Sequence, residues 1–372
     1  MPGPRTVRPV LSRFPHGVTR RDDRHAATRE ATTTRSTRPA LRRRLLLGVL
    51  LATSGLVAQQ RPTPAAQAEP LQPAWRWLAE PPPGLPKMPL PADYTPTAAM
   101  FRLGERLFHD PQLSSDRTIS CASCHPAATG FASPAPRPRG VGEHRAKRHA
   151  PALWNRGYGT LQRWDGSSAD LETFVLEPIG DRDEMALGVD GALQRLREQP
   201  DYAREFEQVF GGPPTRTALQ RSLATFVRGI VAGDAPYDRF LRGDAEAMTA
   251  EQRHGQWIFE SKGGCWKCHT PPLFTDERFH NTGVGVVDGK PEPGRAAATG
   301  DDRDAGQWKT PTLRLVRLTA PFMHDGSLPD LEAVVDFYVR GGNPNDHLDA
   351  RMAPLPLDAA DQKALLMFLR SL

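Results

Sequence analysis

Four segments of the chain space their apolar side chains as one face of a helix does. They form two pairs, AAMFRLGERLF (98–108) with ALQRSLATFVRGIV (218–231), and TAEQRHGQWIFES (249–261) with AADQKALLMFLRSL (359–372). This spacing predicts amphipathic helices, and little of the remaining chain alternates as a strand would. The first helix of each pair contains a glycine, Gly104 or Gly255, four residues before a phenylalanine. Because a glycine inside a helix costs stability, it indicates a close helix crossing. We predict a mostly α protein with long irregular loops.

All four cysteines of the chain belong to C-x-x-C-H motifs. Cys121 and Cys124 are followed by His125, and Cys265 and Cys268 are followed by His269. This pattern is typical of covalently attached c-type haem, in which two thioethers hold the porphyrin and the histidine binds iron. A zinc site built from both pairs would not require a histidine after each pair. A disulfide oxidoreductase would need one pair beside a βαβ pattern. The sequence therefore favours two covalent haems c.

The two motifs lie at equivalent places in the two helix pairs, which indicates an internal duplication. Each half contains a predicted helix, a C-x-x-C-H motif, loops and a closing helix. We predict two cytochrome c-like domains, each with one covalently attached haem, at residues 97–240 and 241–372. The proline-rich segment 69–96 is expected to be an extended tether or a wrapping arm without a core of its own.

Residues 1–68 have the composition of an export leader and signal peptide. Residues 1–44 carry a net charge of +9, and an apolar run, 45–58, follows them. This run is short for a membrane span but typical of a signal peptide, and Ala66-Gln67-Ala68 offers a cleavage site. We expect a periplasmic protein with no membrane span after cleavage; an uncleaved anchor is the alternative. From Glu69 onward the net charge is about −5, which argues against a nucleic-acid partner.

Seven stretches resemble, in order, the bacterial di-haem cytochrome c peroxidase family, and within it the MauG-like branch. They are LGERLFHDPQLSSDRTISCASCH, RHAPALWN, RWDG, EPIGDRDEM, FTDERFHNTGVG, KTPTLRLVRLTAPFMHDGSL and LEAVVDFYVRGG. The resemblance extends from about residue 97 to residue 372. It implies an oxidoreductase that reduces hydrogen peroxide with electrons from a small cytochrome c or cupredoxin, or that oxidises a partner protein.

The resemblance also assigns roles to individual residues. It makes His125 the proximal ligand of the haem that meets peroxide, and His269 the proximal ligand of the electron-relay haem. Trp164 falls where the family has a tryptophan between the haems, and its alternative is a core residue. Glu184 falls on the family's distal glutamate, whose carboxylate can move a proton between the oxygens of peroxide. The alternative for Glu184 is a solvated acidic loop.

Three positions depart from the family pattern near the first haem. His144 lies near a histidine that many members use as a removable sixth ligand, but its spacing to Arg148 differs. If His144 is only an exposed loop residue, the iron is open. Phe174 stands where a glutamine is common. His149 replaces an asparagine of an inter-haem calcium site, and calcium prefers oxygen ligands. The sequence thus argues against calcium, or for calcium bound through water.

The expected sixth ligand of the second iron is also unusual. The position of the peroxidases' methionine, 13 residues after Asp325, is Tyr338, as in the MauG-like branch. A phenolate would favour ferric iron and lower the potential. Met323 is an alternative ligand, and a tyrosine that only packs on the haem edge is another. A di-haem electron-transfer cytochrome, with both irons six-coordinate and no turnover, is the alternative to an enzyme.

Overall fold

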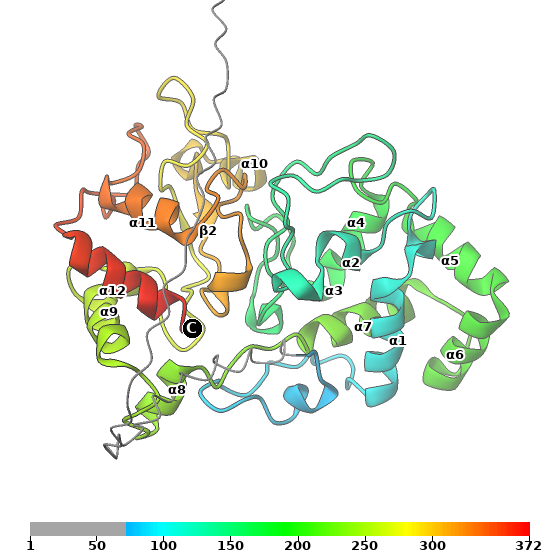
Figure 1. The fold of residues 1–372 in the computed structure, drawn as a ribbon. Coiled ribbons are helices and arrows are strands. Elements are labelled where there is room, and N and C mark those ends of the chain that lie inside the picture. Colours follow the sequence, from blue (N-terminus) through cyan, green and yellow to red (C-terminus); the bar gives the residue numbers. More distant parts are fainter. Residues whose placement is uncertain (1–71) are drawn as a thin grey trace, which may run out of the picture. The chain divides into compact units, whose positions relative to one another are not determined.

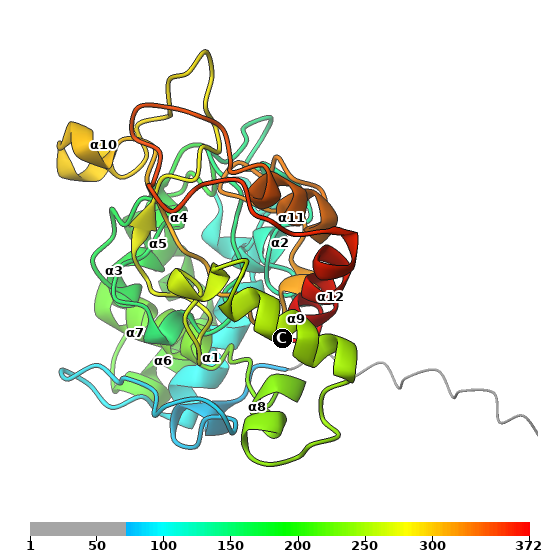
Figure 2. The same cartoon turned by 90° about the vertical axis from the view of Figure 1, so that its left-hand side faces the viewer.

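The computed structural model describes residues 72–372, so the predicted leader and signal peptide lie outside the described residues. The longer helices of each half pack in pairs, as Figure 1 shows. In the first half α1 (Ala98–His109) packs against α7 (Arg216–Arg228). In the second half α9 (Ala250–Glu260) packs against α12 (Ala359–Leu369), and Figure 2 shows this pair from the side. The predicted mostly α fold is confirmed.

Both helix crossings depend on glycine. A Cβ built on Gly104 would lie 2.0 Å from the carbonyl oxygen of Ser222, and one built on Gly255 would lie 2.0 Å from that of Ala364. No side chain fits at that distance, so the backbones touch only because both residues lack a Cβ. The two crossings are equivalent, since each joins the helix before a C-x-x-C-H motif to the last helix of its half.

The remaining elements are short and are joined by long loops. The other α-helices are α2 (Cys121–Cys124), α3 (Leu171–Phe174), α4 (Glu177–Gly180), α5 (Val189–Glu198), α6 (Pro200–Phe210), α8 (Pro236–Leu241), α10 (Ala296–Thr299) and α11 (Leu331–Val339). The 3-10 helices are η1 (Trp75–Leu78), η2 (Pro111–Leu113), η3 (Ala127–Thr129), η4 (Arg156–Tyr158), η5 (Cys265–Lys267), η6 (Asp302–Asp304) and η7 (Val316–Leu318). In the described part of the chain the one sheet is an antiparallel pair, β1 (Phe279–His280) with β2 (Trp308–Lys309).

Each half has its own hydrophobic cluster, and the two clusters share an aromatic pattern. In the first, the ring of Phe226 on α7 lies 5.0 Å from that of Phe108 on α1. In the second, Phe368 on α12 lies 5.3 Å from Phe259 on α9. The phenylalanine after each glycine thus packs on the closing helix of its half. These contacts hold the segment that leads into each motif.

Segment 72–96 lies along the helix and linker that connect the halves. The N–H of Ala74 donates to the carbonyl of Gly229 at 3.1 Å, and the N–H of Asp234 donates to that of Pro83 at 3.0 Å. Nearby, Asp238 on α8 forms a fully buried ion pair with Arg314. This segment therefore packs on residues of the first half. No helix among residues 72–372 is long and apolar enough to cross a bilayer.

Candidate functional site

The first C-x-x-C-H motif forms a single helical turn that presents its histidine to a cavity. α2 spans Cys121–Cys124, and the N–H of Ser120 donates to the Ser123 hydroxyl at 2.9 Å at its start. The Nδ1 atom of His125 lies 2.9 Å from the carbonyl oxygen of Phe131. Because a carbonyl only accepts, Nδ1 carries the proton and Nε2 keeps its lone pair. Burial lowers the pKa of His125 to about 4, so the ring stays neutral, as a metal ligand must.

The second motif repeats this arrangement. Cys265 is the first residue of η5 and Cys268 directly follows it, and Nδ1 of His269 lies 3.0 Å from the carbonyl oxygen of Phe274. Burial lowers the pKa of His269 as well. Phe274 contacts Phe259 at a ring distance of 6.0 Å, as Phe131 contacts Phe108 at 6.5 Å. In each half, the helix before the motif therefore positions the carbonyl that fixes the histidine tautomer.

The thiols do not have the character of a reactive dithiol. All four are free, and burial raises the pKa of Cys121 and of Cys265 to about 12, whereas reactive cysteines have a lowered pKa. Among the described residues, the one group of three possible metal ligands within 4.8 Å is Cys268, Asp276 and His280. Two aspartates engage both ring nitrogens of His280, at 2.9 and 3.0 Å, so no nitrogen remains for a metal.

A cavity of about 460 Å³ joins the two motifs. All four cysteines and both motif histidines line it. Two of its lining residues have a buried ring nitrogen without a hydrogen-bond partner. These atoms are Nε1 of Trp308 and Nε2 of His324. Unpartnered buried polar atoms indicate a missing polar group, and haem brings two carboxylates. The residues present therefore fit haem at both motifs.

Glu184 lines the cavity together with the first motif. Its backbone is fixed on both sides, since its N–H donates to Asp181 at 3.1 Å and its carbonyl accepts from Val141 at 2.8 Å. Burial raises the pKa of this carboxyl, and the guanidinium of Arg163 acts against the rise. A partly buried carboxyl beside a cation can both take and give a proton, which is what acid–base catalysis requires.

Arg163 lines the same cavity as Glu184. Its Nε lies 2.5 Å from Glu177, and its guanidinium lies 5.6 Å from the ring centre of Phe174. Phe174 also lines the cavity. This chain thus has an apolar ring at the position where a glutamine is common in the family, and the polar group beside that ring is the guanidinium of Arg163.

His144 does not line the cavity. Its side chain is 48% exposed, and its Nδ1 lies 3.3 Å from Asp183 at the surface. The loop is closed by a backbone hydrogen bond of 2.9 Å from Gly140 to the carbonyl of His144. This geometry favours the interpretation of His144 as an exposed loop histidine.

Trp164 lines the cavity between the motifs and is fixed by its indole N–H, which donates to the carbonyl of His149 at 2.8 Å. The N–H of His149 in turn donates to His324 at 2.8 Å, and its ring Nε2 bonds to the carbonyl of Ser133 at 2.9 Å. The ring of His324 stacks on Trp308 at 3.8 Å. His149 thus serves as a hydrogen-bonding link through Nε2, and that nitrogen is not free to bind a cation.

Tyr338 and Met323 both line the cavity, so the position of neither residue excludes it as the sixth ligand of the second iron. Tyr338 lies on α11 and lines the cavity together with Cys265 and Cys268 of the second motif. Met323 lies in the loop before α11 with a left-handed φ of 75°, which an ordinary side chain adopts only when the surroundings hold it.

Sequence reasoning gave no role to four residues that the structure brings to this cavity: Arg156, Arg163, Lys309 and His324. All four occur within or beside the stretches that carry the family resemblance, such as RWDG and KTPTLR. The family resemblance therefore pointed to the right stretches of sequence, but only the folded chain indicates that these four residues line one cavity.

Mostly helical architecture with a C-x-x-C-H motif on each side of one cavity defines the class of c-type cytochromes. The family described as di-haem cytochrome c peroxidase matches residues 98–246. MauG, the methylamine utilization protein of Methylorubrum extorquens, is 36% identical over 74% of this chain and 78% of its own length. Cytochrome-c peroxidase IdrP2 of Denitromonas iodatirespirans is 33% identical over 76% of this chain and 84% of its own length.

A crystal structure of a MauG-like protein associated with microbial copper homeostasis superposes with a TM-score of 0.72 at 29% identity, over 78% of this chain and 92% of that one. The chain belongs to the di-haem cytochrome c peroxidase family, and it is an oxidoreductase.

Proposed function

We propose that the protein is exported and reduces hydrogen peroxide at the haem held by Cys121, Cys124 and His125. The observation that carries this proposal is the different placement of two loop residues. Glu184 lines the cavity with the first motif, whereas His144 is held at the surface by Asp183. An acid–base group is thus available, and the candidate capping histidine is turned away. When bound, the haem supplies an iron that binds peroxide and accepts the oxidising equivalents.

The proposed task of Glu184 is proton transfer. Its carboxylate takes a proton from the peroxide oxygen nearer the iron and returns it to the farther oxygen, which leaves as water. Two electrons and two protons complete the reduction to two molecules of water. Phe174 lines the same cavity with an apolar ring.

Electrons are proposed to enter at the second haem, held by Cys265, Cys268 and His269. Trp266, between the two cysteines, is 44% exposed, so this attachment site reaches the surface where a small cytochrome c or cupredoxin can approach. Trp164 lines the cavity that the two motifs share, with its indole fixed by His149, and an aromatic ring held in place can relay electrons.

A second candidate activity is the oxidation of a partner protein. Tyr338, whose phenol is near the second motif, and the 36% identity to MauG favour it. A phenolate ligand would favour the ferric state of that iron, which suits oxidation of a substrate more than uptake of electrons from a donor.

The test is peroxide-dependent oxidation of a reduced small cytochrome by protein made in a host that attaches haem c. We expect Glu184→Gln to lower kcat/KM by about 10²- to 10⁴-fold, the usual contribution of one acid–base group. Glu143→Gln is the matched control, because the Glu143 side chain lies in the neighbouring loop and is 95% exposed. Equal rates for both variants would remove Glu184 from the mechanism.

Low-temperature EPR of the ferric protein separates the enzyme from a plain electron carrier. One high-spin and one low-spin signal are expected, because one iron should be open. Two low-spin signals together with no peroxide-dependent turnover would establish the electron-transfer cytochrome instead.

A further inference from the structure

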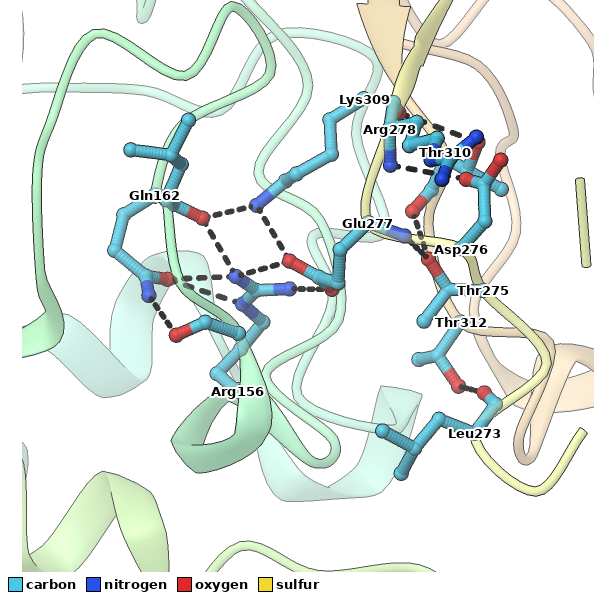
Figure 3. Close-up of polar contacts among 12 residues, drawn as sticks. Arg156, Gln162, Leu273, Thr275, Asp276, Glu277, Arg278, Lys309, Thr310 and Thr312 are labelled. Atoms are coloured by element: carbon cyan, nitrogen blue, oxygen red, sulfur yellow. Dashed lines mark hydrogen bonds and ion pairs between the residues drawn. The ribbon is translucent and has the colours of Figure 1, made fainter. Parts of the chain in front are cut away.

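A buried cluster of charged residues joins the two halves (Figure 3). Arg156 comes from the first half, and Glu277 and Lys309 come from the second. Nη1 of Arg156 lies 2.8 Å from Glu277, and Nζ of Lys309 donates to the carbonyl of Leu161 at 2.7 Å. The three charged side chains are 12%, 19% and 8% exposed, respectively.

The cluster contains more positive than negative charge. Glu277 is engaged by Arg156 through both carboxylate oxygens, whereas Nζ of Lys309 lies 3.8 Å from it, beyond hydrogen-bonding distance. The partner of the ammonium is therefore a neutral carbonyl. A buried cation without a close carboxylate is costly, and it is relieved either by an anion or by loss of a proton.

Lys309 lies at the cavity that both motifs line. Its side chain lines the cavity, and its backbone N–H donates to the carbonyl of Trp164 at 2.8 Å. Burial lowers the pKa of Lys309 to about 7, and the positive charge of Arg156 acts in the same direction. The other charged groups that act on it are Glu277 and Asp165. On the paired strand β1, Phe279 lies opposite Lys309, and His280 lies opposite Trp308 and is engaged by Asp276 and Asp349.

We propose that Lys309 is a proton-exchanging group coupled to the oxidation state of the haem pair. When a haem gives one electron to an oxidant, the ammonium of Lys309 releases one proton to water as neutral amine forms. Reduction of that haem returns the proton. The coupling is electrostatic, because oxidation adds one positive charge to a cavity that Lys309 already makes positive.

This proposal fixes the sign of a measurable effect. A protonated Lys309 opposes oxidation, so the midpoint potential is highest at low pH. As pH rises through the range in which Lys309 loses its proton, the potential falls, by at most about 59 mV for each tenfold change in proton concentration. Outside that range the potential is level.

The experiment is a spectroelectrochemical titration of both haems with ferricyanide and dithionite in the presence of redox mediators. It is repeated from about pH 5 to about pH 9, a range centred on the lowered pKa of Lys309, about 7. Lys309→Met should stay at the lower, high-pH potential throughout. Lys309→Arg keeps the charge and cannot titrate, so it should stay at the higher, low-pH potential with no slope. Lys290→Met removes an exposed lysine charge, which solvent screens, and should behave as the parent.

A slope that persists in Lys309→Arg would overturn the proposal, because another group would then be the one that titrates. If Lys309→Met does not fold, the arginine variant alone still decides. The titration uses no peroxide, so its outcome is independent of whether the proposed peroxidase activity is correct.

Discussion

Replacing Gly255 with alanine should open the α9–α12 crossing and disturb the second haem site. The new Cβ would lie 2.0 Å from the carbonyl oxygen of Ala364 and 2.8 Å from the Cβ of Phe368. Reaching a contact of roughly 3.5 Å requires the two backbones to move apart by more than about 1 Å. α9 ends five residues before Cys265, so this movement is transmitted to the second motif.

The expected cost follows from two opposing effects. Overpacking in a well-packed core costs about 1–3 kcal/mol, and here the obstacle is backbone, which cannot rotate away. Alanine in place of a helical glycine gains about 1 kcal/mol. With the cost at the upper end of that range, we expect a net loss of about 2 kcal/mol, or a fall in Tm of roughly 4–8 °C. Gly180→Ala in α4 is the control, because a Cβ there meets no atom within 4 Å, and it should be neutral or slightly stabilising.

The assay combines thermal unfolding with the ferric EPR spectrum of the holoprotein. Gly255→Ala should alter the signal of the second haem, and Gly104→Ala, which meets Ser222 in the same way, should alter that of the first. The reasoning is refuted if Gly255→Ala is as stable as Gly180→Ala. It is also refuted if each glycine variant changes both haem signals equally.

Two further predictions concern the metal ligands. Tyr338→Phe should change the ligand-dependent absorption of the second ferric haem, because the residue lies beside that motif; an unchanged spectrum would leave Met323 as the candidate. Prolonged treatment with EDTA should leave the ferric EPR spectrum unchanged, because His149 already uses Nε2 to bond to Ser133 where the family has a calcium ligand. A spectral change that added calcium reverses would show that the ion is bound.

The parts of the fold that sequence predicted are those fixed by local pattern. The four amphipathic segments are helices, and Gly104 and Gly255 lie at crossings where a Cβ cannot fit. Each motif histidine is held by a carbonyl within six residues, so a short stretch of sequence determines its orientation. α5 and α6 were not predicted, although both have a buried apolar face, because no motif drew attention to them.

The charged parts of the site could not be predicted in this way, because their partners are far apart in sequence. Arg156 and Glu277 are separated by 121 residues, and Lys309 and Leu161 by 148. No periodicity or spacing relates such positions, and each residue by itself has the composition of a surface loop. Only the packing of the two halves on one cavity makes these charges buried and therefore consequential.

The duplication explains why two similar halves can have different chemistry. The shared crossing, the phenylalanine pair and the carbonyl on Nδ1 hold each motif histidine in the same way, so they would give both proposed irons the same kind of proximal ligand. Any difference between the irons must then come from what the loops place on the opposite side. In the first half α4 leads to Glu184, and in the second α11 carries Tyr338. A carboxyl that moves protons suits an iron that meets peroxide, whereas a phenol that can bind iron suits one that stores or relays charge. Because the scaffold is common, exchanging the roles of the two sites would require changes only in these loops, and the helix crossings could stay as they are.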